Sequence, residues 1–147
     1  MDERRIRTKI KELENYLSEM PDLQAESIDD FQASLKNRRA LERELQIMIE
    51  CVLDICYLIA SELALGPPSD DEHVLDLLSN ELTTIETIRA MKGFRNILVH
   101  KYGIVDDNRV YKFASENCSD FNDFIQDVYN VIERHNINTG NDNSLDV

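Results

Sequence analysis

The chain has no tryptophan and little cysteine, proline or glycine, with three Cys, three Pro and four Gly among 147 residues. The scarcity of Gly and Pro, which interrupt helices, favours a helical bundle. Cys51 and Cys56 lie in one apolar segment, and Cys118 stands apart. An odd number of cysteines without a CxxC pair is typical of reduced, buried thiols, so we expect no disulfide framework, metal site or redox site.

Long apolar runs are also lacking. No run approaches the ~20 residues of a membrane-spanning helix, and the first five residues, MDERR, lack the apolar stretch of a signal peptide. We therefore expect no membrane contact and a cytoplasmic location. Apolar residues make up 42% of the chain and charged residues 31%, which is typical of one soluble globular domain at this length.

Basic residues are few: 16 Lys and Arg stand against 29 Asp and Glu, for a net charge of −13. An acidic surface repels phosphate, so general nucleic-acid binding, including DNA binding, is not expected. Two stretches nevertheless lack acidic residues. The shorter, residues 31–41, fits chance and helix patterning. The longer, residues 87–105, marks a candidate site and contains Arg89, Lys92, Arg95, His100 and Lys101.

Apolar residues at helical spacing predict two helices in the first half of the chain. The first covers residues 6–20 and stops at Pro21. The second runs from residue 27 to residue 65, and because it is unusually long we expect a kink or break near Lys36-Asn37. Its second half is apolar on most sides, which predicts a central position or packing against a second subunit.

Capping residues mark the next two helices. The sequence SDDE at 69–72 is a capping box for a short helix that extends through Leu78. The sequence TTIE at 83–86 is a second capping box, for a helix that runs to about Tyr102. Gly103 suits the left-handed residue that ends this helix.

A fifth helix should begin after Asp106, with an interruption around residues 117–119. No segment alternates between apolar and polar residues, so strands are not expected. The predicted fold class is all-α: an antiparallel bundle of four long helices and one short helix, spanning residues 1–137. Residues 138–147 are rich in turn-forming residues, and we expect a disordered tail there.

The end of the fourth predicted helix carries polar residues that core packing does not explain. Asn96 and His100 fall on nearly the same side of a helix, as do Arg95 and Tyr102. An Arg can hold a phosphate with its planar guanidinium, and a His can donate or accept a proton near neutral pH. These groups suffice for phosphodiester cleavage without a metal. A salt-bridge and capping arrangement at the helix end explains the same residues and stays open.

Residues 93–102, GFRNILVHKY, resemble the signature of HepT-type HEPN toxins: an Arg, four residues, a His, one residue and a Tyr. The sequence RALE at 39–42, the Gly-Pro-Pro loop before a short helix, and NRVY at 108–111 match the wider pattern. The resemblance therefore covers roughly residues 1–135. It implies a HEPN-like bundle that forms a homodimer, with the motif helices of two chains facing each other.

The resemblance also implies a metal-independent ribonuclease toxin that needs no cofactor and acts on RNA. Arg95 would bind the scissile phosphate and stabilise its charge, and His100 would serve as acid and base. Asn96 would orient the phosphate or His100. A dimer would supply two copies of each residue and combine the two basic stretches into one positive cleft.

Tyr102 has a different implied role. In this family the partner is a minimal nucleotidyltransferase antitoxin of the MntA type, which silences the toxin by transferring AMP from ATP to the motif tyrosine, here Tyr102. The protein would then be the toxin of a type VII-like toxin–antitoxin system. Two other functions stay open: a non-catalytic subunit that binds a nucleotide or a nucleotidyltransferase partner, and a plain structural dimer.

Three further polar residues lie outside the motif. We interpret His73 and His135 as solvent-exposed helix residues. Asp54, an acid among apolar neighbours, either approaches the site or is a capped or interfacial carboxylate, and both interpretations stay open.

Overall fold

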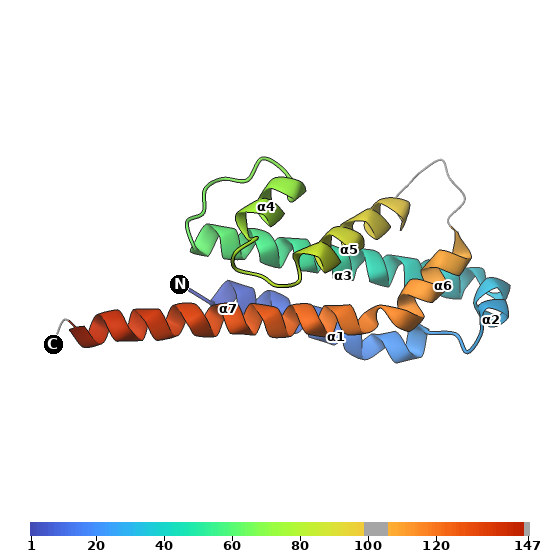
Figure 1. Ribbon diagram of the computed structural model, residues 1–147. Helices are drawn as coiled ribbons and strands as arrows, with labels where there is room; N and C mark the ends of the chain where they lie inside the picture. The colour runs from blue at the N-terminus through green and yellow to red at the C-terminus, as the bar shows by residue number, and fades with distance from the viewer. Residues whose placement is uncertain (99–105, 146–147) are drawn as a thin grey trace.

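A computed structural model describes residues 1–98 and 106–145, with side chains as far as residue 136. All regular secondary structure in these residues is helical (Figure 1). The helices are α1 Arg4–Leu23, α2 Ile28–Ala33, α3 Leu35–Glu62, α4 Asp71–Leu77, α5 Ile85–Leu98, α6 Asp107–Glu116 and α7 Cys118–Leu145. The expected all-α class is confirmed. Within this part of the chain, no helix combines the length and apolar character that crossing a membrane would need.

The helices form an antiparallel bundle in which α3 is central. In Figure 1, α1 runs away from the N-terminus, α3 returns, α5 runs with α1, and α7 returns along the bundle. Helices α1, α5 and the short α4 pack on α3, while α2 packs on α6 at the end far from both termini. The four long helices and one short helix are thus as predicted, and α2 and α6 arise from breaks in two of the long ones.

Apolar side chains on the inner faces form one core. Helix α3 is buried on most sides, as its apolar second half predicts, and contributes Val52, Ile55, Cys56 and Ile59 among others. Three aromatic side chains, Phe31, Phe121 and Phe124, are fully buried. Each such side chain stabilises the fold by roughly 1.5–3 kcal/mol relative to the exposed state. This packing fixes α5, which carries the candidate site, against α3.

Both expected interruptions are present. Helix α2 ends and α3 begins at Ser34, whose backbone is extended and whose hydroxyl accepts a hydrogen bond from the Asn37 amide at 3.2 Å. The break lies slightly before the expected position near Lys36-Asn37 because Ser34 caps the new helix. Helices α6 and α7 meet at Asn117, within the expected interval.

Two expectations about helix ends differ from the structure. Pro21 lies inside α1, which continues to Leu23. The amide missing at Pro21 removes one hydrogen bond in the last turn, and the Gln24 amide closes the helix by donating to the Met20 carbonyl at 3.0 Å. At the end of the chain, α7 continues to Leu145, through the segment for which a disordered tail was expected. The division into residues 1–137 and 138–147 stays a prediction.

Candidate functional site

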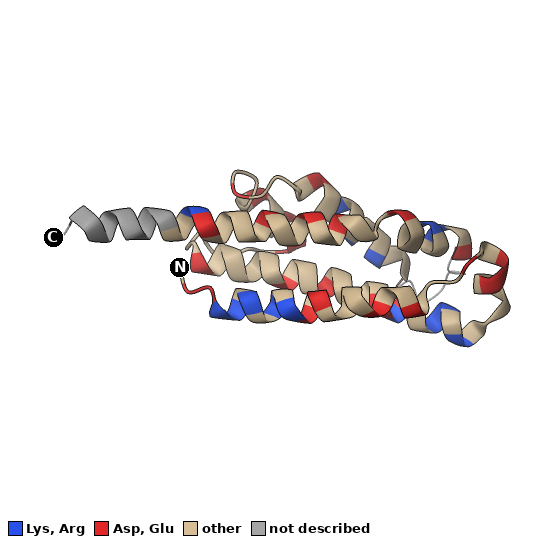
Figure 2. Cartoon of the chain, turned by 90° about the horizontal axis from the view of Figure 1, so that it is seen from below, with Lys and Arg blue, Asp and Glu red and all other residues tan. Residues whose placement is uncertain are grey.

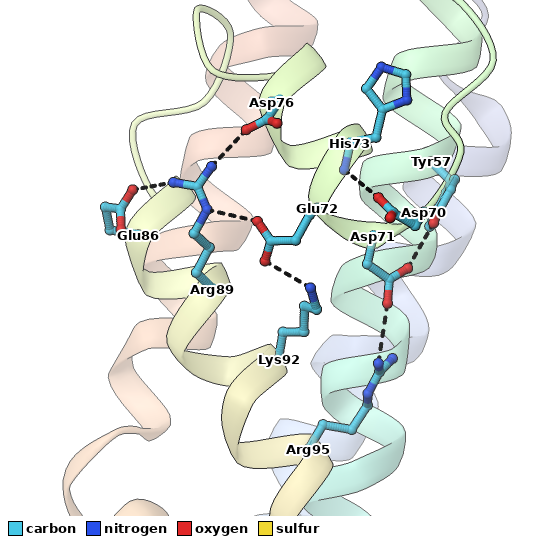
Figure 3. Close-up of polar contacts among 10 residues, drawn as sticks. All are labelled: Tyr57, Asp70, Asp71, Glu72, His73, Asp76, Glu86, Arg89, Lys92 and Arg95. Atoms are coloured by element: carbon cyan, nitrogen blue, oxygen red, sulfur yellow. Dashed lines mark hydrogen bonds and ion pairs between the residues drawn. The ribbon is translucent and has the colours of Figure 1, made fainter.

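Helix α5 presents faces with different roles. Its inner face is buried in the core and consists of Ile85, Ile88, Met91 and Phe94. A second face turns to α4 and carries the basic residues Arg89, Lys92 and Arg95 (Figure 3). Because these three residues recur at every third position, they form one row along the helix.

The start of α5 is fixed by Asp127, a buried carboxylate on α7. Its Oδ2 accepts hydrogen bonds from the Thr83 amide at 2.9 Å, the Thr84 amide at 3.0 Å and the Thr84 hydroxyl at 2.7 Å. The sequence predicted a capping box within residues 83–86, but the capping group lies 43 residues from Thr84. Sequence reasoning missed Asp127; the signal available for it is an acid within the apolar stripe of the last helix.

The start of α4 is capped by Asp70, whose Oδ1 accepts a hydrogen bond from the His73 amide at 2.8 Å. The Ser69 amide donates in turn to Nδ1 of His73 at 2.9 Å. The capping residue is therefore one position later than the SDDE sequence predicted. The ring of His73 closes this cap, and the residue is partly exposed rather than fully exposed as expected.

Helix α4 supplies carboxylates to the basic row of α5 (Figure 3). Glu72 accepts a hydrogen bond from Nε of Arg89 at 3.2 Å and another from Nζ of Lys92 at 2.8 Å. Arg89 also contacts Asp76 at 2.9 Å and Glu86 on its own helix. The Lys92 ammonium, followed by the Arg89 guanidinium, holds the pKa of the Glu72 carboxyl below its usual range. These ion pairs attach α4 to α5.

Arg95 has a carboxylate partner of its own. Its Nη2 lies 3.2 Å from Oδ2 of Asp71, and the Tyr57 hydroxyl donates to the other oxygen, Oδ1, at 2.7 Å. The side chains of Arg95 and Asp71 are 23% and 26% exposed, so the pair lies at the rim of the bundle. Burial, followed by the hydrogen bond to Asp71, raises the pKa of Tyr57 to about 12, so its hydroxyl stays protonated and donates. Helices α3, α4 and α5 are thus joined at the Asp71 carboxylate.

The described cations of the basic stretch therefore have acidic partners in space that they lack along the sequence, and the positive cleft expected of a dimer stays a prediction. Arg89, Lys92 and Arg95 each face a carboxylate of α4. Only one terminal nitrogen of Arg95 bonds to Asp71, and the remaining N–H groups of a guanidinium can bind a further acceptor such as a phosphate. Sequence reasoning missed Asp71 and Tyr57 as partners of Arg95, because a contact among three helices leaves no local pattern.

Two of the four predicted site residues lie within the described part of the chain. Arg95 lies at the rim, and Asn96 beside it is exposed on α5. His100 and Tyr102 lie outside the described residues. Their position relative to Arg95 stays a prediction.

The other polar candidates have partners away from Arg95. Asp54 is exposed and lies 3.5 Å from Lys9. His135 is only partly exposed, unlike the expectation, and its Nε2 lies 3.0 Å from Glu81. Burial raises the pKa of Cys51 to about 11, which keeps this thiol protonated at neutral pH. Among the residues with described side chains, no group of three His, Cys, Asp or Glu is placed to hold a metal ion.

The chain is similar in sequence to known proteins. A family model described as ribonuclease HepT-like matches residues 6–128, an interval that includes the motif at 93–102. A curated relative is the tRNA nuclease HepT of Aphanizomenon flos-aquae (strain 2012/KM1/D3). It is 29% identical over 114 residues, which cover 75% of this chain and 78% of the relative.

Solved structures share the fold. One is the tri-AMPylated HEPN toxin of Shewanella oneidensis in complex with MNT antitoxin, with a TM-score of 0.76 and 23% identity over 84% of this chain and 96% of that chain. Another is YutE, a cytosolic protein of unknown function from Bacillus subtilis, with a TM-score of 0.74 and 20% identity over 92% of this chain and 93% of that chain. At these identities the similarity establishes the HEPN-like bundle and nothing about chemistry.

Proposed function

We propose that this chain, which belongs to the ribonuclease HepT-like family, is the toxin of a toxin–antitoxin pair and cleaves RNA without a metal. The observation that carries the proposal is the position of Arg95. The family is one of ribonucleases, and this chain holds the guanidinium of its motif arginine partly exposed at the rim of the bundle. Asp71 fixes this guanidinium, and Tyr57 fixes Asp71. The curated relative is named a tRNA nuclease, which supports RNA as the substrate class.

In the proposed reaction, His100 accepts the proton of a ribose 2′-OH, and the 2′ oxygen attacks the adjacent phosphorus. The bond from phosphorus to the 5′ oxygen breaks, and His100 of a second chain in a homodimer protonates that oxygen. The products are a 2′,3′-cyclic phosphate and a 5′-OH. Arg95 stabilises the negative charge on the non-bridging oxygens, and Asn96, exposed beside it, orients the phosphate or His100.

Silencing is proposed to act on Tyr102. A partner nucleotidyltransferase binds ATP, and the Tyr102 oxygen attacks its α-phosphorus, losing a proton as pyrophosphate leaves. The AMP group adds bulk and negative charge two residues from His100, so it blocks the site and repels RNA phosphate. A solved relative of the same fold is described as an AMPylated toxin in complex with its antitoxin, which supports this partner class.

Expression of the full chain in cells, beside His100→Ala, tests the function. Wild type is expected to stop growth and degrade cellular RNA, and His100→Ala to grow normally. Equal growth and intact RNA with both proteins would contradict the proposal. Co-expression with a minimal nucleotidyltransferase encoded beside this protein should restore growth and add AMP mass increments to wild type but not to Tyr102→Phe.

One observation favours a second candidate function. Arg89, Lys92 and Arg95 all have carboxylates on α4, as expected for residues that hold helices together. In this alternative, the bundle is a non-catalytic subunit that binds a nucleotide or a nucleotidyltransferase. ATP binding that is lost in Arg95→Ala, together with no RNA cleavage by wild type, would favour it.

A further inference from the structure

A groove lies between α5 and α6, on a face of α5 that does not contact α4. Its volume is about 570 Å³, and its walls are Gly93 and Ile97 from α5 and Arg109, Lys112 and Phe113 from α6. Gly93 lies two residues from Arg95 on the same helix, so the groove begins within one turn of the candidate site.

The floor of the groove is apolar and open. The rings of Phe94 and Phe113 stack with centroids 4.1 Å apart and an interplanar angle of 4°. At Gly93, a Cβ atom would meet no neighbour within 4 Å among the described residues. A flat apolar ligand can therefore approach the α5 backbone here.

One wall of the groove is positive, unlike most of this acidic protein. The side chains of Arg109 and Lys112 are exposed, and neither forms an ion pair within 4 Å among the described residues, although Oδ1 of Asp106 accepts a hydrogen bond from the Arg109 backbone amide at 3.3 Å. The cations of α5 that face α4 are all paired, by contrast. Arg109 and Lys112 are one turn apart, so their side chains point to the same side of α6. In a chain with a net charge of −13, two cations without a described ion-pair partner beside an apolar groove indicate an anionic ligand with an apolar part.

We propose that this groove binds the single-stranded RNA that flanks the scissile phosphate. A base packs on the apolar floor at Gly93 and Phe113, while Arg109 and Lys112 bind the phosphates of neighbouring nucleotides. A single strand is required because its unpaired bases expose their faces, whereas paired bases are stacked within a helix. The assignment rests on the proposed function, since it names the part of the substrate that lies next to the reacting phosphate.

Salt-dependent binding of labelled single-stranded RNA tests the groove. The full chain carries His100→Ala so that the RNA stays intact, and Arg109→Gln/Lys112→Gln is compared with Arg5→Gln/Lys11→Gln. The control pair has the same charge change on the first half of α1, where Lys and Arg gather near the N-terminus (Figure 2). Log affinity falls as log salt rises, and removing two phosphate contacts should make this slope shallower by about 1.4. The affinity lost between 50 and 200 mM salt then becomes about sevenfold smaller than in the parent protein. The control should keep the slope of the parent protein.

Gly93→Leu is a second variant that we expect to keep the fold, because a Cβ at this position meets no described neighbour within 4 Å and leucine favours helix. It fills the apolar floor and should weaken RNA binding at every salt concentration, with no loss of thermal stability. Undiminished RNA binding by a folded Gly93→Leu protein would overturn the groove assignment.

The outcomes separate the groove from the nuclease. An unchanged slope in the groove variant, or an equal drop in the control, would overturn the groove even if wild type cleaves RNA. The expected drop in slope with a wild type that cleaves no RNA would support the groove and contradict the nuclease. If the slope of Arg109→Gln/Lys112→Gln is unchanged and Gly93→Leu sediments as a different oligomer from the parent protein, the groove is instead a contact with a second copy of this chain.

Discussion

Asp71 holds the guanidinium of Arg95 from a neighbouring helix, with Oδ2 and Nη2 3.2 Å apart. Tyr57, from a third helix, holds the other carboxylate oxygen of Asp71 at 2.7 Å. A guanidinium tethered at one edge loses less freedom when a phosphate binds the other. The carboxylate also offsets part of its positive charge. Asp71 therefore has two effects on Arg95: it orients the guanidinium and it offsets part of its positive charge. Substitution of Asp71 can separate the two effects.

Asp71→Asn should lower the rate of RNA cleavage at saturating substrate by about tenfold, because Arg95 is less well oriented toward the transition state. RNA binding should not weaken, since the guanidinium then has no opposing carboxylate. Cleavage rates and RNA affinities of wild type and variant, measured separately, check both effects.

Asp76→Asn is the matched control for this prediction. It removes the same charge from α4, but its partner is Arg89 rather than Arg95. An unchanged cleavage rate in Asp71→Asn, or the same drop in both variants, would contradict an orienting role for Asp71.

Asp127→Ala should destabilise the fold by about 2–4 kcal/mol. It leaves two partly buried amides and one hydroxyl at the start of α5 without their acceptor. Thr84→Val removes only the hydroxyl donor and should cost about 1 kcal/mol. Urea unfolding measures both values. Equal free energies of unfolding for Asp127→Ala and wild type would mean that the carboxylate does not anchor α5.

Glycine substitutions should have opposite effects at two positions. Gly93→Ala should stabilise the fold by roughly 0.5–1 kcal/mol, because Gly93 is helical and a Cβ there meets no described neighbour within 4 Å. Gly66→Ala should destabilise it by roughly 1–2 kcal/mol, because Gly66 has φ of +104°. Thermal unfolding of the two variants compares them directly. A destabilised Gly93→Ala protein would show that a neighbour already fills this face of α5.

The stability of the protein should depend on pH through Glu44. Its Oε1 is buried without a hydrogen-bond partner among the described side chains. Burial, followed by the neighbouring Glu19 carboxyl, raises the pKa of Glu44 from 4.5 to about 7. Between these values the folded state holds a proton that the unfolded state has lost, so Glu44 lowers the free energy of unfolding as pH rises from 4.5 to about 7.

Glu44→Gln keeps the shape of the side chain and removes its titration. The variant should be about 1 kcal/mol more stable than wild type at pH 8. The two should converge near pH 4, where Glu44 is protonated in both states. Denaturant unfolding at several pH values checks this. A constant difference across the range would assign the effect to packing rather than to the Glu44 charge.

Local patterns in the sequence predicted the elements of the fold but not their ends. Helical periodicity identified α1 and the two long helices that break at Ser34 and Asn117, and capping sequences identified α4 and α5. The break at Ser34 arises because this serine ends α2 and caps the start of α3. The spacing of apolar residues alone does not predict such a break. At Pro21 the opposite happened: the sequence predicted an end, and α1 continues to Leu23. A single lost hydrogen bond does not end a helix whose inner face is buried.

Motif residues were predictable and their partners were not. Arg95 stands out by its place in the motif and by the lack of acids around it in the sequence. Asp71 and Asp127 lie far along the chain from the groups they bind, and only the packing of α4 and α7 brings them there. The carboxylates of α4 that pair with Arg89, Lys92 and Arg95 were not predictable for the same reason, since the charge pattern along the sequence does not show which helix faces which.

The most direct test of the central claim is cleavage of single-stranded RNA by the purified chain in excess EDTA. We predict cleavage that leaves 2′,3′-cyclic phosphate ends and falls by at least about a hundredfold in His100→Ala. Arg95→Lys should also be slow, because an ammonium cannot contact Asp71 and a phosphate with the geometry of a guanidinium. Cleavage by His100→Ala at the wild-type rate, or no cleavage by wild type in EDTA, would contradict the account.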